Sequence, residues 1–227
     1  MKIVIFSALF LLFLSYSIMP TYGYKIWNYF QKGRCNQTIY LTFDDGPDSE
    51  YTLQLLNLLD RYNIKASFFV VAEFAKQNSA IIKRMQQAGH LIGLHSLSHK
   101  NGLVQTPAST EYDFEQSIEI MKQLGVDIHY FRPPWGHFNI STILESKKRG
   151  LQAVLWKVMA QDWRGNTTVT KIQQKLIVRT NGGDIVCLHD GRGSNEAPRR
   201  MIEALEGVLP FWISKGYKFD TVEHYYE

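Results

Sequence analysis

The sequence predicts an α/β fold in which parallel βα units build a closed or nearly closed barrel of about seven strands. Strand-like and helix-like segments alternate from Thr38 onward, and no linker-like stretch divides them. The length of 227 residues suits a single α/β barrel. Hydrophobic residues make up 45% and charged residues 20%, which excludes wholesale disorder. A doubly wound open sheet is the alternative arrangement of the same units.

The first two units lie before residue 89. Residues 38–43 are β-branched and aromatic and are followed by Asp-Asp-Gly-Pro, which predicts a strand that feeds a loop. Residues 51–62 repeat leucine with helical spacing. Residues 65–72 contain a second apolar strand, and residues 79–88 are expected to form a helix that ends where glycine follows.

The middle units follow the same pattern. Residues 90–95 predict a third strand, and residues 109–124 a helix that is again ended by glycine. Residues 127–132 predict a fourth strand, which stops at two prolines. The next helix is expected to begin at a capping residue, either Asn139 or Ser141.

The last units complete the alternation. Residues 151–158 and 184–189 are expected to form the fifth and sixth strands, with a helix at 169–179 between them. Residues 197–215 predict a long helix, and residues 217–221 a short seventh strand. Trp156 lies inside the fifth of these strands, where core packing is the expected role.

Residues 1–23 are interpreted separately from the domain, residues 24–227. Residues 3–14 are apolar apart from one serine and follow a single lysine, as in an export signal, and small residues suit cleavage after Gly23. The alternative is an uncleaved membrane anchor, because residues 3–19 reach the lower length limit of a membrane span. Either interpretation places the domain outside the cytoplasm, secreted or anchored to the outer face of the membrane.

The charge pattern argues against nucleic acid as a partner, because the net charge is only +4 and no run of lysine and arginine occurs. After the first expected strand, Asp44 and Asp45 stand where a dinucleotide-binding loop needs glycine. No protein partner is inferred.

Ionisable side chains fall at the carboxyl ends of the expected strands. They are Asp44, Asp45, His95, His99, Arg132, Asp162, His189 and Asp190. In a parallel barrel these ends converge on one face, where barrel enzymes place their sites. Because such side chains are rarely buried without partners, a shared pocket is predicted.

His95 and His99 are four residues apart, and on a helical turn both imidazoles point the same way, which suits one metal ion. Histidines that only make hydrogen bonds are the alternative. Two histidines and one aspartate leave open positions on the metal, as at catalytic zinc. Asp44 and Asp45 would face opposite sides of a strand, but a bend brings both to one site, one as ligand and one as base. A turn with solvated acids is the alternative.

Five stretches then carry a family resemblance. They are Thr-Phe-Asp-Asp-Gly at 42–46, His-Ser-Leu-Ser-His at 95–99, Arg-Pro-Pro-Trp-Gly at 132–136, Asp-Trp at 162–163 and Leu-His at 188–189. In this order they resemble the five motifs of the polysaccharide deacetylase family, also called carbohydrate esterase family four or the NodB homology domain. The resemblance covers roughly residues 36–222 and implies a distorted (β/α) barrel.

The resemblance also implies the chemistry of the site. Asp45, His95 and His99 would bind a divalent metal ion, usually zinc in the family. Asp44 would act as the general base toward the attacking water, and His189 as the general acid that protonates the leaving amine.

Further roles carried over from the family support these groups. Arg132 would pair with Asp44, and Asp162 would hydrogen-bond His189 and favour its charged form. Contacts with substrate would come from the backbone N–H of Trp135, as an oxyanion donor, and from Trp163 and Leu188 around the acetyl methyl.

The expected function is that of a metal-dependent hydrolase that removes N-acetyl groups from glycans such as peptidoglycan, chitin-like polymers or poly-N-acetylglucosamine, releasing acetate. A hydrolase of O-acetyl xylan or of other acyl esters and amides, and a non-catalytic glycan-binding protein, are the alternatives. The partner is therefore a glycan, with membrane attachment through the N-terminal segment if that segment is retained.

The sequence departs from the family pattern in two places. Met159 stands where an additional aspartate is frequent, three residues before Asp162, and Trp135 stands where tyrosine is common. These changes affect the rim of the substrate site rather than the reacting groups. Cys187 is expected to be inert packing rather than a nucleophile, and a disulfide with Cys35 is compatible with an oxidising compartment.

Overall fold

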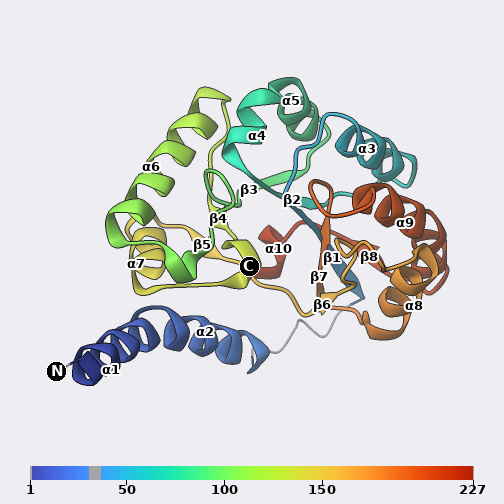
Figure 1. Ribbon diagram of the computed structural model, residues 1–227. Coiled ribbons are helices and arrows are strands. Elements are labelled where there is room, and N and C mark those ends of the chain that lie inside the picture. The colour runs from blue at the N-terminus through green and yellow to red at the C-terminus, as the bar shows by residue number, and fades with distance from the viewer. Residues whose placement is uncertain (1, 31–36, 227) are drawn as a thin grey trace.

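In the computed structural model, a curled parallel sheet is surrounded by helices, and the N-terminal helix lies along one side of this domain (Figure 1). The structure describes residues 2–30 and 37–226. The strands are β1 (Thr38–Asp44), β2 (Ser67–Val70), β3 (Leu91–Leu94), β4 (Tyr130–Phe131), β5 (Gln152–Ala153), β6 (Val158–Met159), β7 (Ile185–His189) and β8 (Lys218–Phe219). Their order is β5-β4-β3-β2-β1-β7-β6, β8 pairs with β1, and each of these pairs is parallel. The predicted α/β class and distorted (β/α) barrel are confirmed.

The fifth expected strand, residues 151–158, is wrong as a single element. It forms two short strands, β5 on β4 and β6 on β7, which are the two edges of the sheet. Residues 154–157 connect them, and no ladder joins β5 to β6 within the described part of the chain. The chain must cross from one edge to the other here, so one continuous strand would pair with neither edge fully.

The helices alternate with the strands as predicted, with two additions, α4 and α10. They are α3 (Tyr51–Arg61), α4 (Ala72–Gln77), α5 (Ser79–Gln87), α6 (Pro107–Gln123), α7 (Ile140–Lys148), α8 (Val169–Arg179), α9 (Ala197–Ser214) and α10 (Glu223–Tyr226). The sequence pattern places Ala72 at the end of the second strand, whereas in the structure that strand ends at Val70 and Ala72 begins the short α4. Asn139 rather than Ser141 caps α7, since its Oδ1 accepts a hydrogen bond from the N–H of Thr142 at 2.7 Å.

Side-chain alternation along β1 separates the hydrophobic core from the site. Ile39, Leu41 and Phe43 belong to the main core cluster with residues of the surrounding helices. The intervening residues, which include Thr42 and Asp44, therefore face the interior of the barrel. The strand thus contributes its apolar face to stability and its polar face to the site.

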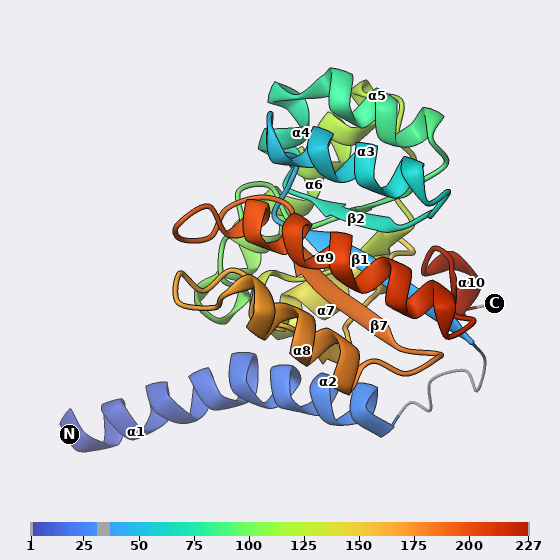
Figure 2. The ribbon, with the colours of Figure 1, turned by 90° about the vertical axis from the view of Figure 1, so that its right-hand side faces the viewer.

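The N-terminal residues form one continuous helix, consisting of α1 (Lys2–Phe13), a π-helical segment at Leu14–Ile18 and α2 (Met19–Phe30). Val4–Phe30 is long and apolar enough to cross a membrane, with a mean hydropathy of 1.9. Figures 1 and 2 show α1 projecting away from the domain while α2 runs along it. The cleavage position considered after Gly23 falls inside α2.

Candidate active site

The two adjacent aspartates reach one site because the backbone turns between them. Asp44 ends β1, and Asp45 has a left-handed conformation with a φ of 72°. The reversal breaks the alternation of an extended strand, and both carboxylates line the same cavity. The bend expected from the sequence is therefore present, and the two acids are buried rather than solvated.

His95 and His99 do not lie on a helical turn, contrary to the expectation. Residues 95–99 form a loop after β3, in which Ser96 and His99 have φ angles of 73° and 58°. The Ser96 hydroxyl accepts a hydrogen bond from the N–H of His99 at 2.8 Å, and Asp113 accepts one from the N–H of Leu97 at 3.0 Å. The loop, rather than helical spacing, turns both imidazoles the same way.

Asp45, His95 and His99 form a buried triad whose ligand atoms lie within 4.8 Å of one another. Asp45 Oδ1 is 2.8 Å from His99 Nε2 and 3.3 Å from His95 Nε2. His95 Nδ1 is 2.7 Å from the backbone oxygen of Arg132, and donation to that oxygen leaves Nε2 free to act as a ligand.

The electrostatics of the triad suit a cation. Asp45 Oδ1 is buried without a hydrogen bond of normal geometry, although two imidazoles face it. Burial raises the pKa of Asp45, but His95 and His99 outweigh this effect and hold that pKa well below its usual range. Two imidazole nitrogens and the unsatisfied oxygen of Asp45 are a donor set that fits a divalent metal ion.

Arg132 fixes the other aspartate from inside the barrel. Its Nη1 donates to Asp44 Oδ1 and to Thr42 Oγ1, both at 2.7 Å, and its Nε donates to the backbone oxygen of Val154 at 3.1 Å. The guanidinium carbon lies 4.1 Å from the centre of the Phe69 ring, and the arginine is completely buried. The arginine is thus held on three sides, so the Asp44 carboxylate is oriented by a rigid partner.

His189 lies at the end of β7, and the carboxylate of Asp162 is its hydrogen-bond partner. His189 Nδ1 is 3.1 Å from Asp162 Oδ1, and Asp162 Oδ2 accepts a hydrogen bond from the N–H of His189 at 2.8 Å. Burial lowers the pKa of His189, but the charge and hydrogen bond of Asp162, followed by the charges of Asp45 and Asp44, raise it to about 9. The Trp163 ring meets the imidazole edge-on, with a centroid distance of 5.0 Å.

A cavity of about 440 Å³ contains the predicted reacting groups. Asp44, Asp45, His95, His99 and His189 line it together with Trp135 and Trp163, whereas Arg132 and Asp162 lie behind them. Leu188 does not line this cavity. It is completely buried in the main core, because it faces the opposite side of β7 from His189.

The sequence did not point to several residues of the cavity wall. His137, Gln161 and Arg192 line it, and so does Trp156, which is only partly buried and is not confined to the core. In the structure, strained backbone marks the cavity wall. Five non-glycine lining residues have positive φ angles: Asp45, His99, Trp135, Gln161 and Arg192. Such conformations cluster at functional sites in proteins. Residue type predicts them only weakly, through the enrichment of aspartate, asparagine and histidine at positive φ.

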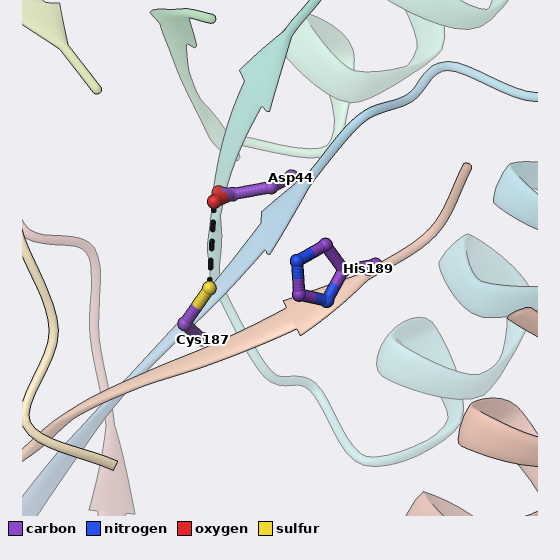
Figure 3. Close-up of side chains that lie close together, drawn as sticks. All are labelled: Asp44, Cys187 and His189. Carbon is purple, nitrogen blue, oxygen red and sulfur yellow. Dashed lines mark hydrogen bonds between the residues drawn. The ribbon is translucent and has the colours of Figure 1, made fainter. Parts of the chain in front are cut away.

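Cys187 lies below the reacting groups on β7. Its buried thiol donates a hydrogen bond to Asp44 Oδ2 at 3.4 Å, and Figure 3 shows this contact beside the imidazole of His189. Burial, and then the charge of Asp44, raises the pKa of the thiol well above its ordinary value, which fits the expected absence of nucleophilic character. Cys35, the other cysteine of the considered disulfide, lies outside the described residues.

Comparison with known proteins places this geometry in a family. Residues 31–154 match the family model described as polysaccharide deacetylase. The chain belongs to the polysaccharide deacetylase family. The predicted family membership is therefore confirmed.

Individual relatives align with this polysaccharide deacetylase over most of the length of both chains. The chain is 33% identical to a peptidoglycan-N-acetylglucosamine deacetylase of Bacillus cereus over 205 residues, which cover 89% of this chain and 92% of the relative. A crystal structure of the Bc1960 peptidoglycan N-acetylglucosamine deacetylase, bound to a benzamide compound, superposes with a TM-score of 0.79 and 28% identity, covering 85% and 90% of the two chains. A family 4 acetyl xylan esterase from Clostridium thermocellum, solved with a cobalt ion, gives a TM-score of 0.75 and 32% identity, covering 83% and 90%.

Proposed function

We propose that this protein is a metal-dependent hydrolase that removes acetyl groups from N-acetylated glycans, with cell-wall peptidoglycan as the first candidate substrate. The observation that carries the proposal is the buried triad of Asp45, His95 and His99 in one cavity with Asp44 and His189. In that cavity, a metal-ligand set, a carboxylate base and an imidazole acid can all act on the same amide bond of a substrate. The peptidoglycan deacetylase relatives support the choice of substrate.

A divalent metal ion held by the triad, zinc by preference, lowers the pKa of water and polarises a carbonyl when bound. Asp44 accepts the proton of the attacking water, and Arg132 keeps the carboxylate in position for that transfer. His189 donates a proton to the leaving amine nitrogen, and Asp162 keeps the imidazole charged and oriented for it.

The substrate contacts complete the assignment. The backbone N–H of Trp135 is the proposed donor to the developing oxyanion, and its exposed ring provides a surface for a sugar face. Trp163 packs on His189 and closes the site around the acetyl methyl. A protonated imidazole is required because an amine is a poor leaving group without a proton.

Mass spectrometry of products tests the proposal. Zinc-loaded protein should remove about 42 Da per event from N-acetylglucosamine oligomers or peptidoglycan fragments, the mass change of amide hydrolysis by activated water. Asp45→Ala and His95→Ala should lose both zinc and acetate release. Full activity in either folded variant would reject the ligand assignment, and the absence of acetate from every glycan would reject the function.

An O-acetyl esterase is the second candidate, and the structural likeness to the acetyl xylan esterase favours it. Both reactions use the same groups, but an ester can expel an alkoxide without a proton donor, whereas an unprotonated amide would have to expel a far more basic nitrogen anion. The dependence on His189 therefore separates them. A His189→Ala variant that hydrolyses acetyl xylan but not N-acetylglucosamine oligomers would show that this site supports both, whereas activity on xylan alone in the unaltered protein would make it an esterase.

We also propose that the N-terminal segment is retained and holds the domain at the outer face of a membrane. Its second half contacts the domain with polar groups as well as with Tyr24, whose ring stacks on Phe138 at a centroid distance of 4.2 Å. Thr21 Oγ1 both donates to the backbone oxygen and accepts from the N–H of Phe138, at 2.7 and 2.8 Å. The completely buried Ser17 donates to the Leu103 backbone oxygen at 2.8 Å, and Tyr16 donates to Ser141 Oγ at 2.8 Å.

Cleavage after Gly23 would remove the polar contacts, and a segment that is discarded has no use for them. The projecting α1 is apolar and exposed, and its 12 residues suit shallow insertion into lipid rather than a full span. Intact-mass measurement of the protein from the membrane fraction tests the proposal: the retained form contains residues 1–23. A mature chain that begins at Tyr24 in the soluble fraction would overturn it.

A further inference from the structure

Beside the catalytic cavity lies a second hollow of about 380 Å³, here called the side pocket. Helix α2 forms one wall of it with Lys25 and Tyr29, and the segment between β5 and β6 forms the opposite wall with Trp156 and Lys157. The side pocket therefore exists only where α2 is packed against the catalytic domain.

The side pocket adjoins the catalytic cavity. Trp135, Trp156 and Met159 line both hollows, so these three side chains form a wall that the two share. Two of the three are tryptophans, whose flat faces suit the apolar faces of sugar rings. An extended glycan placed with one sugar at the metal triad would thus present a neighbouring sugar to the side pocket.

The side pocket is cationic. Lys25 Nζ lies 3.5 Å from the backbone oxygen of Trp135, and Lys157 Nζ lies 3.0 Å from the backbone oxygen of Tyr29. Neither ammonium group forms an ion pair with an acid of the described residues, and no described acid lines the side pocket. Two lysines without carboxylate partners leave positive charge to be matched by a ligand.

We propose that the side pocket binds a carboxylate on the sugar next to the one that is deacetylated. The enzyme then prefers an acidic glycan, such as a strand with the lactyl carboxylate of muramic acid, over a neutral N-acetylglucosamine polymer. This inference rests on the proposed function and narrows its substrate class. Met159 contributes by leaving the shared wall uncharged, because a carboxylate there would occupy the lysines.

Binding of two tetrasaccharides to the full chain in detergent tests the proposal without requiring turnover. One probe is the neutral N-acetylglucosamine tetramer, and the other is the peptide-free tetramer of alternating N-acetylglucosamine and N-acetylmuramic acid. Calorimetry should give about tenfold tighter binding of the acidic probe, and the ratio should fall as salt rises. A third probe carries peptides that block the lactyl carboxylate as an amide.

Two variants separate charge from folding. Lys25→Met with Lys157→Met removes the cations, while Met159→Asp keeps both lysines and supplies an internal carboxylate. Both should bring the acidic-to-neutral affinity ratio close to one, while the control Lys83→Met, at an exposed position of α5, should keep the ratio. Acetate release, followed in parallel, should show the same change in the ratio of kcat/KM.

Equal affinity of the unaltered protein for both probes, or a preference that persists in both variants, overturns the proposal. A preference for only the peptide-bearing probe overturns the lactyl assignment. If no probe releases acetate, the proposed function fails, and the affinity ratios still decide whether the side pocket recognises a carboxylate.

Discussion

Arg132 Nη1 and Asp44 Oδ1 are 2.7 Å apart in the interior of the barrel, where both side chains are almost completely inaccessible to solvent. The pair depends on elements that are distant in sequence, since Asp44 ends β1 and Arg132 follows β4. Removing one partner would leave a buried charge without compensation. The contact therefore links the stability of the barrel to the position of the proposed base.

Arg132→Met is expected to lower the free energy of unfolding by about 3–5 kcal/mol, because Asp44 loses its buried partner. Arg132→Lys retains the charge, but one ammonium group cannot reproduce the separate contacts to Asp44, Thr42 and Val154. The lysine variant should fold, bind metal and show a kcat at least about tenfold lower. Denaturant unfolding and acetate release measure the two effects, and a kcat unchanged in the folded lysine variant would contradict the positioning role.

Asp162→Asn is expected to move the alkaline limit of activity. The pKa of His189 is raised to about 9 chiefly by Asp162, so the imidazole remains protonated at neutral pH and loses its proton as the pH rises through that value. The asparagine removes the negative charge, and the alkaline limb of the kcat profile should shift down by about one to two pH units. Asp127→Asn, whose side chain is 98% exposed, is the matched control. An unmoved limb in Asp162→Asn would exclude this coupling.

The pKa of His189 also determines how the stability of the metal-free protein depends on pH. The pKa of His189 is raised from 6.5 to about 9 on folding, so its stabilising contribution is complete below pH 6.5 and is lost as the pH rises through about 9. Asp190 acts in a lower window, since burial raises its pKa from 3.8 to about 7 and its ionisation opposes folding as pH rises through that range. The Tm, measured by thermal unfolding, should therefore fall more steeply between pH 7 and pH 10 in the unaltered protein than in the Asp162→Asn variant. Parallel curves would contradict the assignment.

The sequence predicts the fold well because hydrophobic periodicity and glycine stops are local signals. β1 and α8 lie where the pattern puts them, at Thr38–Asp44 and Val169–Arg179. The division of residues 151–158 into two strands is not predictable in this way. Apolar composition predicts a strand, but it does not predict which edge of the sheet each half will join. Pairing is decided by the closure of the barrel, which is a property of the whole chain.

The candidate site is predicted in its residues but not in its geometry. Their positions at strand ends predict that Asp45, His95 and His99 share one site. In the structure, it is the left-handed backbone at Asp45 and His99 that turns these side chains toward one another. Aspartate and histidine adopt this conformation more often than most residues, but too rarely for residue type alone to predict it. Leu188 shows the opposite failure, because the motif suggests a pocket residue where strand alternation places the side chain in the core.

Removal of the metal should weaken the fold as well as abolish acetate release. Asp45 Oδ1 is buried against two imidazoles, so a bound cation satisfies a group that is otherwise without a hydrogen bond. A metal ion at about one hundred times its Kd adds about 2.7 kcal/mol to the free energy of unfolding. Chelation should lower the Tm, zinc or cobalt should restore it, and His99→Gln should make the Tm insensitive to both. A Tm that does not respond to chelator in the unaltered protein would contradict the site.

Cys187→Ala and Cys187→Ser test whether the thiol supports Asp44. The thiol donates to Asp44 Oδ2 while Arg132 donates to Oδ1, so the carboxylate is held at both oxygens. Alanine removes the donor and leaves a small cavity, and it is expected to cost about 1–2 kcal/mol in the free energy of unfolding and to lower kcat severalfold. Serine keeps a donor and should recover most of kcat even if stability is not recovered. Because Cys187 is completely buried and burial raises the pKa of its thiol, iodoacetamide should modify it only after unfolding. Equal kcat in the alanine and serine variants would show that the hydrogen bond has no part in positioning the base.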